Sequence, residues 1–77
     1  MDLVIETGRE VIGVDIKASR IVRPADLRGL ASLAETVGRY KPVSRYVAYR
    51  GTETQVFEPK VRVLPYQDLL HELATKP

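Results

Sequence analysis

The first seventeen residues constrain the fold more than any other part of the chain. Two segments rich in β-branched residues, 2–6 and 11–17, flank a polar tetrapeptide that contains Gly8 and Arg9. This pattern predicts a β-hairpin, and Gly8 can adopt the positive φ that the first central position of a type II′ turn requires. A two-residue loop at this point fixes the register by counting outward. The predicted cross-strand pairs are Ile5 with Ile12, Leu3 with Val14, Val4 with Gly13 and Asp2 with Asp15.

The predicted register brings two carboxylates together. Asp2 and Asp15 lie opposite each other with Cβ atoms about 5 Å apart, and Lys17 points the same way because side chains alternate along a strand. Like charges in this position repel each other, so either Lys17 or a divalent cation is expected between them. Paired carboxylates suit Mg²⁺, and a neighbouring lysine can activate water for attack on a phosphodiester. The structural alternative is an exposed acidic pair at the end of the sheet, which Lys17 partly neutralises.

Composition limits the chain to one small domain, residues 1–77. With 77 residues and a net charge of +2, a single modest core is expected, and the charge is too weak to indicate nucleic-acid binding by itself. The sequence contains no cysteine, which suits a reducing cytoplasm, and we expect the protein to be cytoplasmic. It contains neither a long apolar segment nor a signal-peptide pattern, so no association with a membrane is expected.

The rest of the chain predicts two helices and further strands. The expected elements are a helix from Pro24 to Val37, a strand over 43–50, a short extended piece within 55–59, a last strand over 60–64 and a helix over 66–74. The buried stripe of the first helix is expected to contain Leu27, Leu30, Ala31, Ala34 and Val37. Because this helix connects two strands of one sheet, those strands should be parallel. The predicted fold class is α/β, a mixed four-stranded sheet with a crossover helix and a C-terminal helix in the order ββαββα.

Basic residues follow both the predicted carboxylate pair and the third strand. The segment 39–50 contains four basic residues, three tyrosines and no acid, as in a nucleic-acid surface where arginines contact phosphates and tyrosines stack on bases. Structural tyrosines and solvated basic side chains explain the same pattern. The connection after Lys17 is likewise either a phosphate-facing rim or a solvated loop. The predicted nucleic-acid-binding residues are Arg20, Arg23, Arg45 and Arg50.

Two resemblances follow from these residues. Asp2, together with Asp15-Ile16-Lys17 at the end of the second predicted strand, resembles the PD-(D/E)XK signature of the restriction-endonuclease-like superfamily. The whole chain is similar, more closely, to the C-terminal domain of unknown function of a family of bacterial and archaeal AAA-type ATPases. The segments that carry this similarity are DLVIE, VIGVDIKAS, ADLRGLASLAE, YVAYRGTET and VRVLPYQDLLHEL.

The resemblance implies a truncated restriction-endonuclease-like core and assigns roles within it. Asp2, Asp15 and the backbone carbonyl of Ile16 would bind Mg²⁺, and Lys17 would be the catalytic lysine, acting with Asp15. The chain departs from the superfamily because no proline precedes Asp2 and no helix and strand come before it. It also lacks a GxxxxGK[ST] loop, so the ATPase activity of the longer proteins does not carry over. We therefore expect it to correspond to the C-terminal part of a longer protein, with an ATPase domain as a partner.

Two functions are compatible with this sequence. The first is a non-catalytic module for docking, oligomerisation or nucleic-acid binding, without a cofactor. The second is a Mg²⁺-dependent nuclease that cleaves phosphodiesters with Asp2, Asp15 and Lys17. In the full superfamily fold a further strand would cover the outer edge of residues 2–7, and without it this edge exposes unpaired backbone groups. The sequence therefore predicts a homodimer joined through the edge from Asp2 to Thr7.

Overall fold

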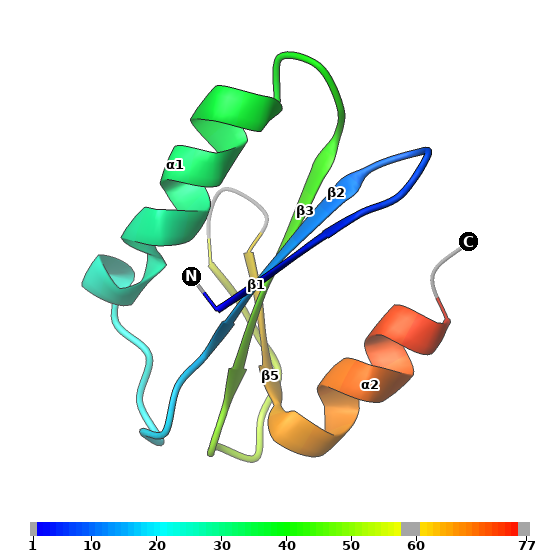
Figure 1. Cartoon of the computed structure of the whole chain (residues 1–77). Helices are drawn as coiled ribbons and strands as arrows, with labels where there is room; N and C mark the ends of the chain where they lie inside the picture. Colours follow the sequence, from blue (N-terminus) through cyan, green and yellow to red (C-terminus); the bar gives the residue numbers. More distant parts are fainter. Residues whose placement is uncertain (1, 58–60, 76–77) are drawn as a thin grey trace.

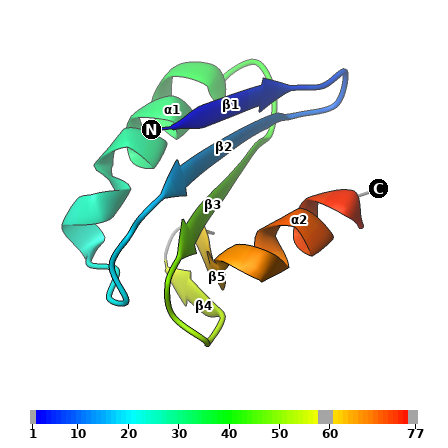
Figure 2. The ribbon, with the colours of Figure 1, turned by 60° about the horizontal axis from the view of Figure 1, so that its bottom comes forward.

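The computed structural model describes residues 2–57 and 61–75. They form one five-stranded sheet with a helix packed on each face (Figure 1, Figure 2). The elements along the chain are β1 (Leu3–Glu6), β2 (Val11–Ile16), the 3₁₀ helix η1 (Pro24–Leu27), α1 (Arg28–Val37), β3 (Val43–Tyr49), β4 (Gln55–Phe57), β5 (Val61–Pro65) and α2 (Tyr66–Ala74). Neither α-helix in these described ranges has the length and apolarity needed to cross a membrane.

The strands follow the order β1-β2-β3-β5-β4 across the sheet. β2, β3 and β5 run parallel to one another, and β1 and β4 pair antiparallel at the two edges. The connection through η1 and α1 crosses from β2 to β3, as predicted. The three parallel strands therefore end on the same side of the sheet, which is the lower end in Figure 1.

The sheet has five strands where four were predicted. The additional strand is β4, which lies at the edge beside β5. It has only three residues, and the side chain of Val56 within it is 68 % exposed, so no alternating apolar pattern marks it in the sequence. The start of the last predicted strand and the end of the predicted extended piece fall on residues 58–60, outside the described ranges. The mixed α/β class is confirmed, and the element order becomes ββαβββα.

The N-terminal hairpin has the predicted register. Its pairs are Leu3 with Val14, Val4 with Gly13, Ile5 with Ile12 and Glu6 with Val11. The amide of Thr7 donates to the carbonyl of Glu10 at 2.9 Å, so the loop contains two residues, as predicted. The predicted type II′ turn is wrong, because the φ of Gly8 lies outside the range from +20° to +160°.

The crossover helix begins with a 3₁₀ turn instead of an α-helical one. The carboxylate of Asp26 accepts the amide of Arg23 at 2.9 Å, while the amide of Asp26 donates to the carbonyl of Arg23 at 2.9 Å. Leu30 is fully buried, as predicted, but Ala31 is exposed. A 3₁₀ turn has about 3.0 residues per turn rather than 3.6, so the residues after it are rotated relative to one continuous α-helix.

Each face of the sheet has its own apolar core. The core beneath α1 consists of Val22, Leu27, Leu30, Val47, Tyr49, Val61 and Val63, with Phe57 packed against it. The core on the other face consists of Ile12, Val14, Tyr46 and Leu64, against which Ile5, Leu69 and Leu73 pack. Because side chains alternate along a strand, the two tyrosines of β3 lie on opposite faces.

Candidate anion-binding site

The loops that follow β2 and β3 meet at the carboxyl ends of the parallel strands. The amide of Lys17 donates to the carbonyl of Ala48 at 2.8 Å, and the amide of Arg50 donates to the carbonyl of Ser19 at 3.1 Å. These bonds continue the β2–β3 pairing beyond the sheet, so the connection after β2 runs beside the loop after β3. Open sheets with parallel strands usually bind their ligands at this end.

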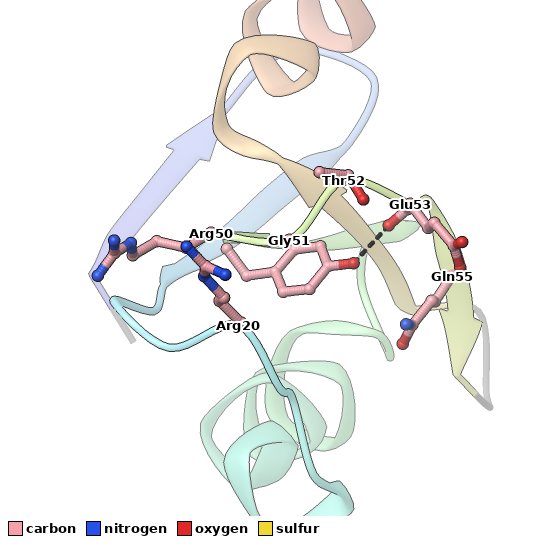
Figure 3. A pocket seen from close by; sticks show the side chains of 7 residues that line it. Arg20, Arg50, Gly51, Thr52, Glu53 and Gln55 are labelled. Carbon is pink, nitrogen blue, oxygen red and sulfur yellow. Dashed lines mark hydrogen bonds between the residues drawn. The ribbon is translucent and has the colours of Figure 1, made fainter.

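A pocket of about 410 Å³ opens between these two loops (Figure 3). The residues that line it are Arg20, Tyr49, Arg50, Gly51, Thr52, Glu53 and Gln55. Arg20 and Arg50 lie at one end, and Glu53 and Gln55 lie at the other. The pocket is therefore basic at one end, and it carries a carboxylate and an amide at the other.

Tyr49, at the end of β3, lines the pocket and anchors its loop. Tyr49 is only 2 % exposed, and its hydroxyl donates to the carbonyl of Glu53 at 2.6 Å (dashed line in Figure 3). The loop passes so close to the ring that a Cβ atom at Gly51 would overlap with ring and hydroxyl atoms. Glycine is needed here for close approach rather than for an unusual backbone angle, and the buried ring holds the loop in place.

The positive charges of the pocket are not neutralised by ion pairs. Within residues 2–57 and 61–75, neither Arg20 nor Arg50 forms one, and both side chains are exposed. A neighbouring pocket of about 400 Å³ shares Arg20 and adds Arg23, so the basic surface continues along the connection after β2. Asp26 also lines this second pocket, where its carboxylate accepts the amide of Arg23. Guanidinium groups arranged in this way suit a phosphate or a carboxylate ligand.

The predicted nucleic-acid-binding residues divide into two groups. Arg20 and Arg50 line one pocket, and Arg23 lies in the pocket beside it. Arg45 is buried on the face of β3 that α1 covers and is not part of either pocket. Tyr46 and Tyr49 are buried as well, so they do not present rings for base stacking. The structural interpretation of these tyrosines is correct.

The two carboxylates of the predicted pair lie near the end of the hairpin and differ in exposure. The strand pairing ends at Leu3 with Val14, and the amide of Asp2 donates to the carbonyl of Val14 at 3.1 Å, so the pairing of Asp2 with Asp15 stays a prediction. Asp2 is exposed, and its carboxylate accepts the amide of Ile16 at 2.6 Å. Asp15 is 3 % exposed, and Lys17 is half-buried.

This arrangement fits an open Mg²⁺ site poorly. Mg²⁺ usually keeps several water ligands, whereas the carboxylate of Asp15 is buried on the face that α1 covers. The carboxylate of Asp2 already accepts a backbone amide. In the described part of the chain, no group of three or more His, Cys, Asp and Glu residues is placed to hold a metal ion. The Mg²⁺ site of Asp2, Asp15 and the Ile16 carbonyl therefore stays a prediction.

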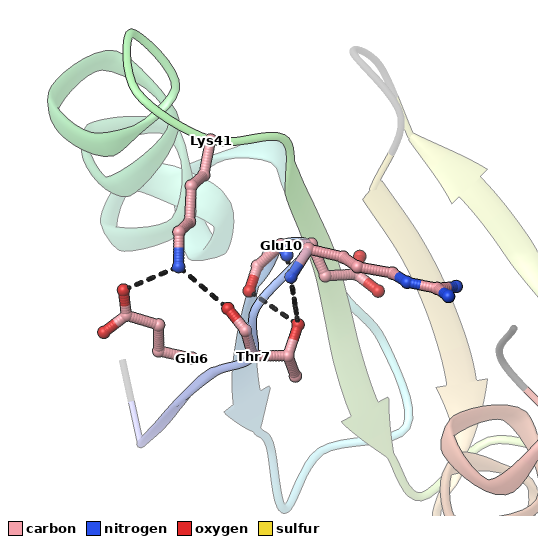
Figure 4. Close-up of polar contacts among 5 residues, drawn as sticks. Glu6, Thr7, Glu10 and Lys41 are labelled. Carbon is pink, nitrogen blue, oxygen red and sulfur yellow. Dashed lines mark hydrogen bonds and ion pairs between the residues drawn. The ribbon is translucent and has the colours of Figure 1, made fainter.

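Polar groups at the opposite end of the sheet serve the hairpin turn (Figure 4). The hydroxyl of Thr7 accepts the amides of Arg9 at 3.2 Å and Glu10 at 3.0 Å, and it donates to the carbonyl of Glu10 at 3.1 Å. The ammonium of Lys41 donates to the carbonyl of Thr7 at 2.8 Å and pairs with the carboxylate of Glu6 at 2.9 Å. The side-chain hydrogen bonds of Thr7 therefore stabilise the turn. The sequence prediction considered only the conformation of Gly8 and did not include these bonds.

The end of the pocket that lies opposite the arginines was not predicted. The sequence indicates only a turn at this point, although Thr52 and Glu53 line the pocket. The signal that was available is Gly51, two residues after Tyr49 at the end of a strand. A glycine in such a place often marks a close approach of the backbone to another group.

One protein family matches most of the chain. The family described as "Domain of unknown function (DUF4143)" matches residues 1–69. The chain belongs to this family. The comparison with curated proteins and the comparison with solved structures each gave no match. The matched residues include all five strands, the crossover helix and both loops of the pocket, so the candidate site is part of the family domain.

Proposed function

We propose that this chain is a non-catalytic nucleic-acid-binding module. The observation that carries the proposal is the pocket that Arg20 and Arg50 both line from two separate loops. From the sequence resemblance, we also propose that the module has a restriction-endonuclease-like core and corresponds to the C-terminal domain of an AAA-type ATPase. In such a protein, the ATPase domain would be its partner within the longer chain.

The chemistry of the site supports phosphate as the group that is bound. A guanidinium can donate two parallel hydrogen bonds to one phosphate, and phosphates receive half or more of the contacts between proteins and DNA. Arg20, Arg23 and Arg50 lie at the carboxyl ends of β2 and β3, and Lys17 begins the same connection. Binding through phosphate contacts does not depend on the nucleotide sequence of the ligand, and it weakens as the salt concentration rises.

A Mg²⁺-dependent nuclease is the second candidate, because Asp2 and Asp15 both lie near the end of the hairpin, where the amide of Asp2 donates to the carbonyl of Val14. The burial of Asp15 favours the non-catalytic module, since a phosphodiester and a hydrated metal ion would both have to reach this carboxylate. We expect no cleavage of an oligonucleotide in the presence of Mg²⁺. If the wild type cleaves the oligonucleotide and Asp15→Asn does not, the protein is a nuclease and the proposal of a non-catalytic module is wrong.

Fluorescence anisotropy with labelled single-stranded and duplex oligonucleotides tests the binding module. The variants R20Q and R50Q should each weaken binding by about tenfold, because each removes a charge-assisted hydrogen bond to phosphate. Each should also reduce the slope of log K against log salt concentration by about one. The matched control is R9Q, which removes an exposed arginine from the hairpin turn at the other end of the sheet. An equal loss in R9Q, or no binding at low salt, contradicts the proposal.

A further inference from the structure

We infer that the pocket between the two loops binds the terminal phosphate monoester of a nucleotide, in preference to the diester phosphates of a continuous backbone. This inference rests on the proposed function, because it names the part of a nucleic acid that the pocket recognises. A free mononucleotide carries the same monoester, so the two sources share one chemistry and must be separated by experiment.

Two guanidinium groups match the charge and the free oxygens of a monoester. A terminal phosphate carries a charge of about −1.5 to −2 at neutral pH and has three free oxygens, whereas a backbone diester carries a single charge. Arg20 and Arg50 come from separate loops and lie at the same end of the pocket. Each can donate a bidentate pair of hydrogen bonds. Both can hold one phosphate only where that phosphate has enough free oxygens, which favours the monoester.

The other end of the pocket disfavours a second phosphate. The carboxylate of Glu53 lies there beside the amide of Gln55 (Figure 3), and it would repel a phosphate while accepting hydrogen bonds from sugar hydroxyls. The amide of Gln55 can both donate and accept hydrogen bonds, as the edge of a base requires. A nucleotide would therefore lie along the pocket, with its phosphate at the arginines and its sugar toward Glu53. The pocket volume of about 410 Å³ is in the range of small-molecule sites.

The backbone of the pocket is held in place by the fold itself. The hydrogen bond from the Tyr49 hydroxyl to the carbonyl of Glu53 fixes the far end, and the bond from the amide of Arg50 to the carbonyl of Ser19 joins the two loops. The close packing of Gly51 on the tyrosine ring adds to this restraint. Ligand binding then has to order little more than the arginine side chains, which reduces its entropic penalty.

The test compares one oligonucleotide, labelled at its 3′ end, with a 5′-phosphate and with a 5′-hydroxyl. We expect the phosphorylated form to bind the wild type at least about tenfold more tightly, and AMP to compete with it. R20Q and R50Q should each remove this preference, whereas R9Q should retain it. R50K keeps the charge but loses the planar bidentate donor, so it should retain only part of the preference.

The pH dependence of the preference provides a second readout. The second pKa of a phosphate monoester is about 6, so the preference for the phosphorylated form should shrink as the pH falls from about 7.5 to about 5. Binding of the 5′-hydroxyl form should change little over this range. The charged groups that line the pocket are Arg20, Arg50 and Glu53. Measuring E53Q in parallel tests whether the pH dependence belongs to the phosphate of the ligand, because the variant should show the same dependence as the wild type.

The possible results separate the inference from the proposed function. Equal affinities for the two forms, with binding lost in R20Q, would overturn the inference and leave the proposed function standing. A preference that survives in both R20Q and R50Q would also overturn it, because the phosphate would bind elsewhere. If neither oligonucleotide binds, the proposed function is wrong. In that case binding of AMP supports a monoester pocket for a free nucleotide, and no binding of AMP overturns both.

Discussion

Single residues hold the two loops that frame the sheet at its opposite ends. Gly51 lets the loop after β3 lie against the ring of Tyr49, and Thr7 closes the hairpin turn with its hydroxyl. In both places a side chain adds to the backbone hydrogen bonds that set the path of the loop. Substitutions at these positions should therefore act on one loop each while the sheet remains folded.

Gly51→Ala should damage the pocket and lower the stability of the fold together. The new Cβ atom would overlap with the buried ring of Tyr49 and force it away from its hydrogen bond to Glu53. Overpacking of this kind lowers the free energy of unfolding by about 1–3 kcal/mol, and oligonucleotide affinity should fall as well. Urea denaturation and anisotropy measure the two effects. Gly8→Ala is the control, because nothing lies within 4 Å of a Cβ atom there. Equal losses in the two variants would contradict this account of the loop.

Thr7→Val should destabilise the hairpin by about 1–2 kcal/mol. The substitution keeps a β-branched side chain but removes the hydroxyl that bonds to Arg9 and Glu10. Glu6→Gln provides the comparison, because it weakens only the exposed ion pair with Lys41 and should change the free energy of unfolding by less than about 1 kcal/mol. Chemical denaturation measures both variants. If Thr7→Val unfolds at the same denaturant concentration as the wild type, the hydroxyl does not hold the turn.

The elements that could be predicted from the sequence are those that local interactions determine. The hairpin register follows from a two-residue loop, so counting was sufficient to obtain it. The phase of the crossover helix depends on the 3₁₀ turn that Asp26 supports, and for this reason Ala31 was wrongly placed in the buried stripe. β4 exists through its pairing with β5, and a three-residue edge strand has too little pattern of its own to be recognised.

The free edge of β1 supports the proposed homodimer through Asp2–Thr7. Within the described ranges β1 pairs only with β2, and Leu3 and Val4 are 47 % and 49 % exposed. Pairing with β1 of a second copy would satisfy this edge. Sedimentation equilibrium should show a dimer, and Val4→Lys should convert it to a monomer. Val56→Lys, on the opposite edge strand, should remain dimeric. A monomeric wild type at high concentration would rule the dimer out.

Over the whole molecule, the two ends of the sheet differ in how their basic side chains are paired. The arginines of the pocket lie at the carboxyl ends of the parallel strands, whereas Lys41 at the other end pairs with Glu6. A net charge of +2 does not reveal this separation. Arg20 and Arg50 could each be predicted as candidates from the sequence. Their meeting in one pocket could not, because it depends on the crossover through α1 and on the packing of the loop against Tyr49.

Amide chemical shifts during a titration with a 5′-phosphorylated oligonucleotide test most directly whether the ligand binds at the carboxyl end of the sheet. We predict that the largest changes occur at Arg20, Arg50 and Thr52, that they occur without Mg²⁺, and that they are lost in R20Q. Changes that require Mg²⁺ and centre on Asp2 and Asp15 would contradict this prediction and place the function at the carboxylate pair.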